Sequence, residues 1–525
     1  MSSVKALEEV LKDWEAVIGL EIHAELTTLD TKMFCGCKLE HGAAPNTHTC
    51  PVCLGLPGAL PVPNKAAIES IVLAGLATNC DIEKHSMFYR KNYMYPDMAK
   101  NFQTTQGPIA FCMRGSLDFE VDGAGVAERI DVDGLGPGES RGNVTMTDDG
   151  YVAHVGITRI HMEEDAGKMV HIGGDEGRIA GATHSLVDYN RAGMPLIELV
   201  TEPDLRTPEE ARLFMEKLRQ IYLAIGISDC SMEEGSMRCD GNVSLRRRGT
   251  AQLGTKTELK NMNSFKNLHD GLAFEIRRQA EVLEEGGIIY QETRHWDPTA
   301  KRTIVMRVKE TADDYRLFPE PDLAPFDLSD EFIEGVRTRL PELPDQKKRR
   351  YRDAFGLSAY DARHLIEHRA TADFFEAAMA CANDVSLAKP LANLVINDVT
   401  ARMNADADFD LASSPLTPQR ACDLVKLLAA DDISSKQGKE VFAAIIDDDA
   451  DPAAIVEARG MRQVSDTAAI EAVIDQVIAE NADAVERYRA GNAKLIGFFV
   501  GQCMKAMRGQ GNPKVINRIL AQKLK

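Results

Sequence analysis

The sequence predicts an α+β fold for its first three-fifths, followed by segments that are entirely helical. Between Val17 and about Asp322, β-like apolar runs alternate with glycine-rich turns, and few stretches show helical periodicity. Beyond Pro319–Asp322 the chain becomes rich in alanine and leucine at helical spacing, with breaks at Pro341–Pro344 and Ser413–Thr417. We therefore place domain boundaries near these breaks.

Composition excludes several classes of protein. The formal charge of the 525 residues is −20, which rules out a uniformly basic nucleic-acid-binding surface but leaves room for a local basic patch. Hydrophobic residues make up 44% and charged residues 27%, as in folded globular proteins. The first nine residues carry acids where a secretory signal needs an apolar core, and no run of 18 apolar residues follows. We expect a cytoplasmic protein that makes no contact with membranes.

The elements expected in the first part are a strand, a hairpin and two helices. Ala16–Leu26 alternates so that Glu21, His23 and Glu25 share one face of a strand. The glycine- and aspartate-rich stretch 121–150 indicates a surface hairpin or insertion. A helix should begin after Thr207 as N-cap, with Pro208 at its first position and Glu210 completing a capping box, and a second helix should cover about Leu268–Leu283.

Four cysteines form a pattern typical of a metal site. Cys35-Gly36-Cys37 and Cys50-Pro51-Val52-Cys53 are separated by twelve residues, and four thiolates at this spacing can close a tetrahedral Zn²⁺ site. Because such a site leaves no position for water, its role would be structural. Unligated thiols and redox or iron–sulfur use are the alternatives. The other seven cysteines are dispersed and typical of buried apolar residues.

Carboxylates and histidines recur in three segments that could together bind a hard metal ion. They are Glu21 with His23, Glu163 with Glu164, and Glu198. Carboxylate oxygens with an imidazole suit Mg²⁺, which proteins often hold together with substrate phosphates. Each cluster alone is equally consistent with a solvated acidic face or a structural histidine.

Basic residues in the same part of the chain are candidates for binding phosphates, although they could equally form surface ion pairs. These residues are Arg90, Lys91, Lys100, Arg238, Lys256, Lys260, Arg294 and Arg307. A Walker-type phosphate loop and a kinase signature are absent from the sequence, so a nucleotide would be held differently. It also lacks a recognisable amidase or glutaminase centre, so we expect that the chain does not generate ammonia itself.

The C-terminal segment is basic although the whole chain is acidic. From Arg489 to Lys525 it carries eight Lys and Arg residues and no acid, which indicates either a contact with a polyanion or a solvated basic helix face. The candidate contact residues are Lys494, Lys505, Arg508, Lys514 and Arg518.

Seven motifs, taken together, resemble the B subunit of the aspartyl/glutamyl-tRNA amidotransferases, the GatB family, from about residue 15 to the C-terminus. They are Val17–His23, Cys50–Gly58, Arg90–Tyr93, Glu163–Lys168, Asp188–Gly193, Lys260–Phe265 and Asp314–Arg316. The tail sequences Gly491–Gln502 and Gly511–Lys514 match as well. The related archaeal E subunit carries an insertion for which this chain is too short.

The resemblance implies an enzyme that uses ATP to phosphorylate the side-chain carboxylate of misacylated Asp-tRNA(Asn) or Glu-tRNA(Gln). Ammonia from a partner amidase, the A subunit, then displaces the phosphate, and a small C subunit completes a heterotrimer. The implied fold is a glutamine synthetase/guanido kinase-like cradle over residues 15–322, with the cysteine insertion near 35–53. An extension (1–14), a helical domain (323–415) and a helical tRNA-binding tail (416–525) make up the remainder.

The resemblance also implies roles for individual residues. The family's Mg²⁺ ligands fall on Glu21, His23, Glu198 and either Glu163 or Glu164. Lys91 and Lys100 match lysines near the exit for ammonia, and Asp240 is a candidate for a second, transient metal. Arg238, Arg294 and Arg307 are candidates for binding ATP, and the four cysteines match a zinc site present in some members.

Two other functions compete with this one. A zinc-stabilised tRNA-binding scaffold without catalysis would explain the cysteine cluster and the basic tail, but it would not need the carboxylates and histidines. A glutamine-synthetase-like ligase acting alone on a small acid would explain the ATP chemistry, but it would leave the basic tail unused.

Overall fold

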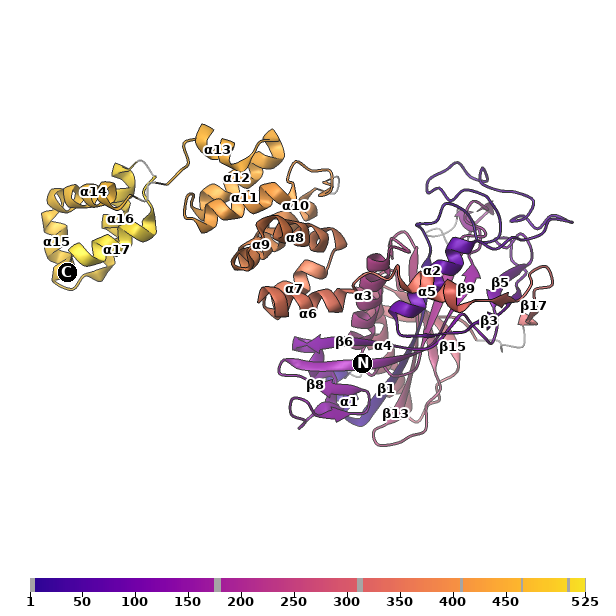
Figure 1. The fold of residues 1–525 in the computed structure, drawn as a ribbon. Helices are drawn as coiled ribbons and strands as arrows, with labels where there is room; N and C mark the ends of the chain where they lie inside the picture. Colours follow the sequence, from indigo (N-terminus) through magenta and orange to yellow (C-terminus); the bar gives the residue numbers. More distant parts are fainter. Residues whose placement is uncertain are drawn as a thin grey trace. The chain divides into compact units, whose positions relative to one another are not determined.

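The computed structural model describes residues 5–173, 181–308, 315–406, 409–463, 466–507 and 510–524. The chain forms two compact units, Met1–Leu343 and Pro344–Lys525 (Figure 1). The first unit is mixed α/β with one large sheet, and the second is helical. The predicted order, a mixed domain followed by helical segments, is therefore confirmed.

Within the described residues, the first unit contains a fourteen-stranded sheet and two small two-stranded ones. The large sheet contains β1 (Trp14–Glu25), β2 (Asp81–Ile82), β4 (Phe88–Asn92), β5 (Phe102–Gln106), β6 (Cys112–Asp122), β7 (Ser140–Arg141), β8 (Val144–Met146), β9 (Gly150–Glu164), β12 (Pro195–Thr201), β13 (Met237–Arg247), β14 (Thr257–Lys260), β15 (Glu292–Asp297), β16 (Arg302–Val308) and β17 (Phe318–Pro319). The small sheets pair β10 (Lys168–Ile172) with β11 (His184–Asp188), and β3 (His85–Ser86) with β18 (Phe326–Asp327).

The main path through the sheet runs β16-β15-β14-β13-β1-β12-β9-β5-β4-β17, and β14 and β15 pair in parallel. The predicted strand is found as β1, at the centre of this path. The 121–150 stretch forms short 3₁₀ turns and the β7–β8 hairpin, which pairs with β9, so the predicted hairpin is also confirmed.

The sheet buries one face under helices because its central strands alternate apolar and polar residues. Ile22 pairs with Leu199 on β12, and both side chains are buried in the main core. The helices of this unit are α1 (Leu7–Asp13), α2 (Lys65–Ala77), α3 (Pro208–Ile225), α4 (Phe265–Glu284) and α5 (Asp330–Arg337). Helices α3 and α4 lie side by side, and α4 packs against β13 (Figure 1).

Helix α3 begins where the sequence predicts, but its capping differs. The Thr207 hydroxyl accepts a hydrogen bond from the Glu210 backbone N–H at 3.0 Å, as expected of an N-cap. The Glu210 carboxylate, however, accepts from the Arg206 backbone N–H at 2.7 Å and from the Arg129 guanidinium at 2.7 Å. The predicted capping box is therefore wrong, because the buried Arg129 draws this carboxylate away from the N-cap.

The second unit is built from helices. They are α6 (Pro344–Phe355), α7 (Ala359–Ile366), α8 (Arg369–Ala382), α9 (Ala388–Asn393), α10 (Thr400–Ala405), α11 (Pro418–Ala429), α12 (Ser435–Asp448), α13 (Pro452–Ala458), α14 (Thr467–Glu480), α15 (Ala482–Arg489), α16 (Ile496–Ala506) and α17 (Pro513–Lys523). One core contains residues from Tyr351 to Met461 and another contains residues from Ile470 to Leu524. The expected boundaries near residues 322 and 415 stay predictions.

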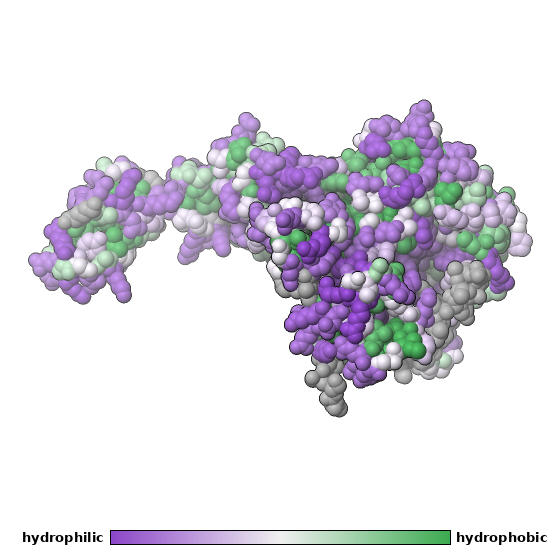
Figure 2. Space-filling view, turned by 90° about the horizontal axis from the view of Figure 1, so that it is seen from below, coloured by the Kyte–Doolittle hydropathy of each residue, from purple (hydrophilic) through white to green (hydrophobic). Residues whose placement is uncertain are grey.

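The surface of the chain matches its composition. On the face that Figure 2 shows, hydrophilic residues cover most of the area and hydrophobic ones gather in small separate patches. Among the described residues, no helix is both long enough and apolar enough to span a bilayer.

The Arg129–Glu210 pair predicts a large stability effect. Both side chains are buried, and the Tyr151 hydroxyl also donates to Glu210 at 2.9 Å. We expect Arg129→Ala to lower the free energy of unfolding by about 3–5 kcal/mol, because it leaves a carboxylate buried without its cation. Urea denaturation measures this loss. Lys266→Ala, which breaks an exposed pair with Asp270 on α4, should cost less than about 1 kcal/mol. Equal losses for the two variants would contradict the assignment.

Candidate functional site

The polar face of the central sheet brings four titratable or charged side chains into one row. The strand registers place His161 opposite Glu198, Glu198 opposite His23, and His23 opposite Arg238, across β9, β12, β1 and β13. Because side chains alternate along each strand, residues two positions away from this row share the same face. Two groups of potential metal ligands arise in this way.

The first group consists of His23, Glu163 and Glu198. One ligand atom from each lies within 4.8 Å of the others. His23 Nε2 is 3.1 Å from Glu198 Oε2, and the buried His161 Nε2 lies 3.3 Å from Glu163 Oε1 and 3.7 Å from Glu198 Oε2. Burial alone would raise the pKa of Glu198, but His161 and His23 outweigh it and hold the pKa well below its usual range. Two ionised carboxylates and an imidazole therefore converge, which is a donor set that suits a divalent cation.

The geometry separates Glu163 from Glu164 and favours Glu163 as the metal ligand. Adjacent residues of a strand point to opposite faces, and Glu163 lies on the face of His23. The Glu164 carboxylate instead binds the Lys100 ammonium and accepts from the Thr104 backbone N–H at 2.8 Å. Lys91 lies on the Glu163 side, where the carboxylates of Glu163 and Glu198 raise its pKa against the effect of burial.

The second group consists of Glu21, Asp240 and Glu258, whose ligand atoms also lie within 4.8 Å of one another. Glu21 thus joins Asp240 rather than the His23 group. Lys260 binds Asp240 and lies 3.6 Å from Glu258. Glu258 is buried and accepts from the Thr293 hydroxyl at 2.7 Å. Sequence reasoning missed Glu258, because only the pairing of β13 with β14 brings it to this face.

Beside the first group, the carboxyl groups of Glu25 and Asp165 lie next to each other and to two arginines. Arg238 Nη2 donates to Asp165 Oδ2 at 2.5 Å, and Arg191 Nε lies 3.8 Å from the same atom. Burial and the hydrogen bond to Asp165 raise the pKa of Glu25 to about 8. Asp165 stays ionised because Arg238 and Arg191 outweigh its burial and hold its pKa low. The pair therefore shares one proton, and Arg238 is held at the edge of the site.

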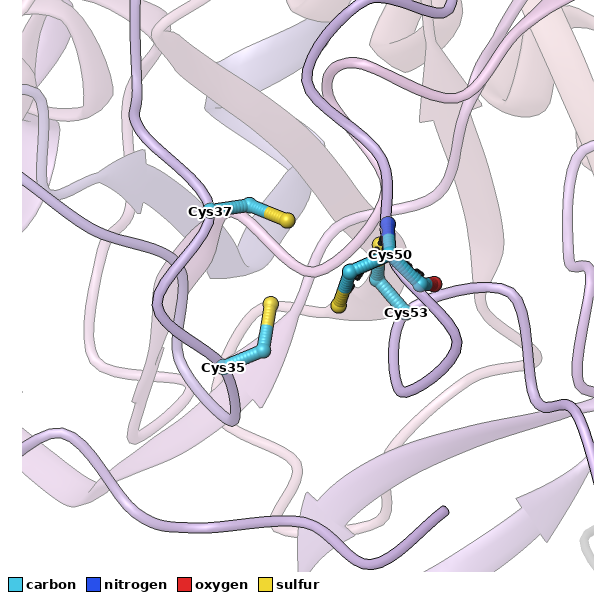
Figure 3. Close-up of side chains that lie close together, drawn as sticks. All are labelled: Cys35, Cys37, Cys50 and Cys53. Carbon is cyan, nitrogen blue, oxygen red and sulfur yellow. Dashed lines mark hydrogen bonds between the residues drawn. The ribbon is translucent and has the colours of Figure 1, made fainter.

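The four cysteines converge as the sequence predicts (Figure 3). Their sulfurs lie within 4.8 Å of one another, with Cys35 and Cys37 on one loop and Cys50 and Cys53 on another. The fully buried Lys32 ammonium lies 3.7 Å from Cys53 Sγ and donates to the Tyr189 carbonyl at 3.0 Å. A hydrogen bond from Cys35 lowers the pKa of Cys53 to about 5. A buried ammonium beside four thiols fits a bound cation with four thiolates, because the lysine offsets the excess negative charge.

A cavity of about 230 Å³ separates the cysteine loops from β4 and β5. Its lining includes Lys32, Cys53, Arg90, Lys100, Glu164 and Glu320. Arg90 donates two hydrogen bonds to Glu320, each at 2.7 Å. The cavity therefore has charged walls on the side of Lys100 and Glu164, which is opposite to the face that carries the metal-ligand groups.

The remaining candidates for phosphate binding differ in their surroundings. The Arg294 guanidinium donates to the Glu292 carboxylate at 2.5 Å and to the Thr303 hydroxyl at 2.9 Å. These internal hydrogen bonds use the groups that would bind a phosphate. The side chain of Arg307 lies outside the described part of the structure. Arg238 Nε is buried and has no hydrogen-bond partner among the described residues. Arg238 is therefore held beside the carboxylate groups, which Arg294 is not.

Of the basic tail residues, Lys505 lies on α16, Lys514 and Arg518 lie on α17, and Lys494 lies in the 3₁₀ turn that precedes α16. Lys494, Lys505, Lys514 and Arg518 are exposed, and Arg508 lies outside the described residues. Lys514 pairs with Asp431 at 2.7 Å. The other three stay available to a ligand, in agreement with either interpretation of this segment.

Sequence reasoning also missed His161 and Lys32. His161 stands two residues before Glu163, and this spacing alone places it on the same face. Lys32 gave no comparable signal, since nothing in its neighbourhood marks a lysine that is fully buried.

Comparisons with known proteins agree with the resemblance in the motifs. Residues 16–334 match the family model of the GatB/GatE catalytic domain, and residues 373–524 match that of the GatB domain. Three relatives are named as the B subunit of aspartyl/glutamyl-tRNA(Asn/Gln) amidotransferase. The protein from Carboxydothermus hydrogenoformans is 48% identical over 98% of this chain and 99% of its own length. The one from Synechococcus elongatus is 48% identical over 99% of both chains, and the one from Persephonella marina is 45% identical over 98% and 100%.

The Glu25 carboxyl predicts a pH-dependent stability. Its pKa is about 8 in the folded chain against a usual value of 4.5, so the folded state holds an extra proton between these values. The contribution of Glu25 to the free energy of unfolding is therefore fully present below about pH 4.5, and it is lost as the pH rises from there through 8. We expect Glu25→Gln, which stays neutral, to lose less stability than the wild type between pH 6 and pH 9, as measured by urea denaturation. If the free energies of unfolding of the wild type and Glu25→Gln changed in parallel with pH, the shared proton would be refuted.

The Lys32 ammonium predicts the strength of metal binding at the cysteines. We expect the purified chain to hold one zinc ion, and Lys32→Met to release it about tenfold faster to a coloured chelator, because the charge beside Cys53 is lost. Lys38→Met is the matched control, since that lysine is exposed and also lies between the first strand and the second cysteine pair. Equal release from both variants would show that Lys32 does not act on the site.

Proposed function

The chain belongs to the GatB family, the B subunits of the aspartyl/glutamyl-tRNA(Asn/Gln) amidotransferases, and we propose that it is the component that activates the misacylated amino acid. ATP transfers its γ-phosphoryl group to the side-chain carboxylate of Asp on tRNA(Asn) or Glu on tRNA(Gln). Ammonia then attacks the acyl phosphate, and inorganic phosphate leaves. The products are the amide, ADP and phosphate, and the protons lost by the amine pass to solvent.

The observation that carries the proposal is the pair of carboxylate groups on one sheet face. His23, Glu163 and Glu198 form one group, and Glu21, Asp240 and Glu258 form the other. Mg²⁺ bound at such groups would neutralise phosphate charge and orient the nucleotide. We propose Glu163, rather than Glu164, as the ligand beside His23. A phosphoryl transfer that needs charge neutralisation more than covalent chemistry suits this arrangement.

The chain's own cations complete the site. Lys91 lies beside Glu163 and Glu198, where it can bind the carboxylate or the phosphoryl oxygens of the substrates. Arg238, positioned by Asp165, borders the same face and is a second candidate for ATP. Activation is needed because a carboxylate repels nucleophiles and lacks a good leaving group, whereas an acyl phosphate has one. A cradle closed around these groups would also protect the acyl phosphate from water.

Ammonia would reach the site past Lys100. The charged cavity lined by Lys100 and Glu164 adjoins the cysteine loops. It lies on the other side of β9 from the Glu163 carboxylate. We propose that it belongs to the route from a partner amidase, the A subunit, and that a small C subunit completes the heterotrimer. The cysteine cluster would hold a structural Zn²⁺ that fixes the loops bordering this cavity.

The remaining parts of the proposal concern architecture and location. The mixed unit would form a glutamine synthetase/guanido kinase-like cradle over residues 15–322, and the helical segments 323–415 and 416–525 would form two further domains. The exposed Lys494, Lys505 and Arg518 of the tail support a contact with the phosphate backbone of folded tRNA, together with Lys514 and Arg508. The enzyme would act in the cytoplasm.

A catalytically inactive tRNA-binding scaffold is the second candidate. Its support is the combination of the cysteine cluster with the exposed basic tail, neither of which requires catalysis. Against it stand two adjoining groups of ionisable ligands that such a scaffold would not need.

Amide formation with ammonium chloride in place of a partner tests the proposal. We expect the purified chain with ATP and Mg²⁺ to convert Asp-tRNA(Asn) or Glu-tRNA(Gln) to the amide. His23→Ala and Glu198→Gln should each reduce the rate by roughly a hundredfold, because they remove ligands that offset developing charge. Both variants should keep their affinity for tRNA, and Glu334→Gln, on the exposed surface of α5, should keep the wild-type rate. Binding of tRNA without any ATP turnover, also with the partner proteins present, would favour the scaffold.

A further inference from the structure

A pair of stacked tyrosines, the half-buried Tyr93 and the exposed Tyr95, stands at the end of the strand that carries Lys91. The rings of Tyr93 and Tyr95 are 5.2 Å apart between centroids and within 13° of parallel. Tyr95 is 49% exposed, and Met94 between them is 71% exposed. Since Tyr93 covers one face of the Tyr95 ring, the exposed part of Tyr95 is its outer face and edge. Adjoining apolar groups that border a polar site are a common feature of ligand-binding surfaces.

The segment that carries the two rings is held in place from several sides. The Tyr93 backbone N–H donates to the Asn101 carbonyl at 3.0 Å, which extends the pairing of β4 with β5. The Tyr189 hydroxyl donates to the Pro96 carbonyl at 2.6 Å. The Gly167 backbone N–H donates to the Asp97 carbonyl at 2.8 Å. A Cβ at Gly167 would lie 3.1 Å from this carbonyl oxygen, so the close approach favours glycine.

The pair also lies next to the reacting groups of the proposed function. Tyr93 is two residues from Lys91, a spacing of roughly 7 Å along an extended chain. The Lys91 ammonium lies 5.0 Å from the centre of the Tyr315 ring, and burial, which would lower its pKa, is outweighed by the charges of Glu163 and Glu198. A third ring, Tyr315, thus borders the same edge of the site.

We propose that the Tyr93–Tyr95 pair binds the adenine base of the 3′-terminal adenosine of the aminoacyl-tRNA, with the base stacked on the outer face of Tyr95. This inference rests on the proposed function. Proteins bind the bases of single-stranded RNA by stacking them on aromatic side chains, and the 3′ end of a tRNA is single-stranded. A fixed ring pair loses little conformational freedom when a base stacks on it.

The length of the aminoacyl-tRNA end is compatible with an adenine on this ring, and the single-stranded 3′ end is the reason for choosing it over the adenine of ATP. In aminoacyl-tRNA only one ribose and the aminoacyl group separate the terminal adenine from the reacting carboxylate. In ATP a ribose and three phosphates separate the adenine from the transferred phosphorus. The stacking ring, Tyr95, is four residues from Lys91, a spacing of at most roughly 13 Å along an extended chain, which an adenosine with its aminoacyl group can span. The flanking Met94 and Pro96 are apolar and add no cation that would bind a triphosphate.

A double-mutant cycle in binding tests the proposal with the full chain. The affinities of wild type and Tyr95→Ala are measured for one tRNA with and without its terminal adenosine. We expect removal of the adenosine to weaken binding to the wild type about tenfold and to leave binding to Tyr95→Ala unchanged. Tyr95→Phe keeps the ring and should keep the tenfold dependence. Tyr290→Ala removes a ring that is 67% exposed in another loop of the same unit, and this control should also keep it.

Three results would overturn the proposal. One is a wild type that binds both tRNAs equally, or a Tyr95→Ala variant that still prefers the full-length one. Another is a raised KM for ATP in Tyr95→Ala with the dependence on the terminal adenosine intact, which would place the adenine of ATP on the ring. The third is a loss of affinity for the amidase partner alone. Since the binding cycle needs no turnover, an intact cycle without amidation would contradict the proposed function and not this site.

Discussion

The register of β1 against β12 and β13 is the constraint on which the rest of the first unit depends. With His23 opposite Glu198 and Arg238, one face of these strands carries the polar row, and Ile22, Leu199 and Cys239 fall on the other face. A slip of one residue would turn every side chain of β1 over, burying carboxylates under the helices and exposing the core. The same hydrogen-bonded ladder therefore determines both the hydrophobic core and the geometry of the site.

This coupling explains which parts of the architecture could be predicted. The alternation in β1 and the cap at Thr207 are local signals, and both elements appear where the sequence places them. Helix α4 extends beyond its expected start because Ser264 caps it, with its hydroxyl accepting from the Asn267 backbone N–H at 3.1 Å. The role of Glu210 could not be predicted, since its partner Arg129 lies far away in the sequence.

The site residues fall into two sets in the same way: some are recognisable from short sequence motifs, and others only from contacts made in the folded chain. The cysteine spacing and the period-two motifs point to Cys53 and His23 from the sequence alone, and they narrow a third ligand to Glu163 or Glu164. The grouping of Glu21 with Glu258 and the contact of Lys32 with Cys53 depend on strand pairing and loop packing, which no short motif encodes. The proposal of Glu163 rather than Glu164 depends only on the direction in which each side chain leaves β9.

Charge compensation links the three buried clusters of the first unit. Each places acidic groups where water is scarce and sets a basic side chain against them: Lys91 beside Glu198, Arg238 beside Asp165, and Lys32 beside Cys53. Buried charges persist only when they are paired, so the acids that stay ionised, such as Glu198, Asp165 and Cys53, each have a fixed cation nearby. In the cluster of His23, Glu163 and Glu198 several ligands meet few cations, and a metal ion would supply the difference; among the cysteines a metal ion would favour the ionised form of all four thiols. Between Glu25 and Asp165 a shared proton reduces the negative charge instead. We therefore interpret these two residues as the groups that position Arg238, and not as a further metal site.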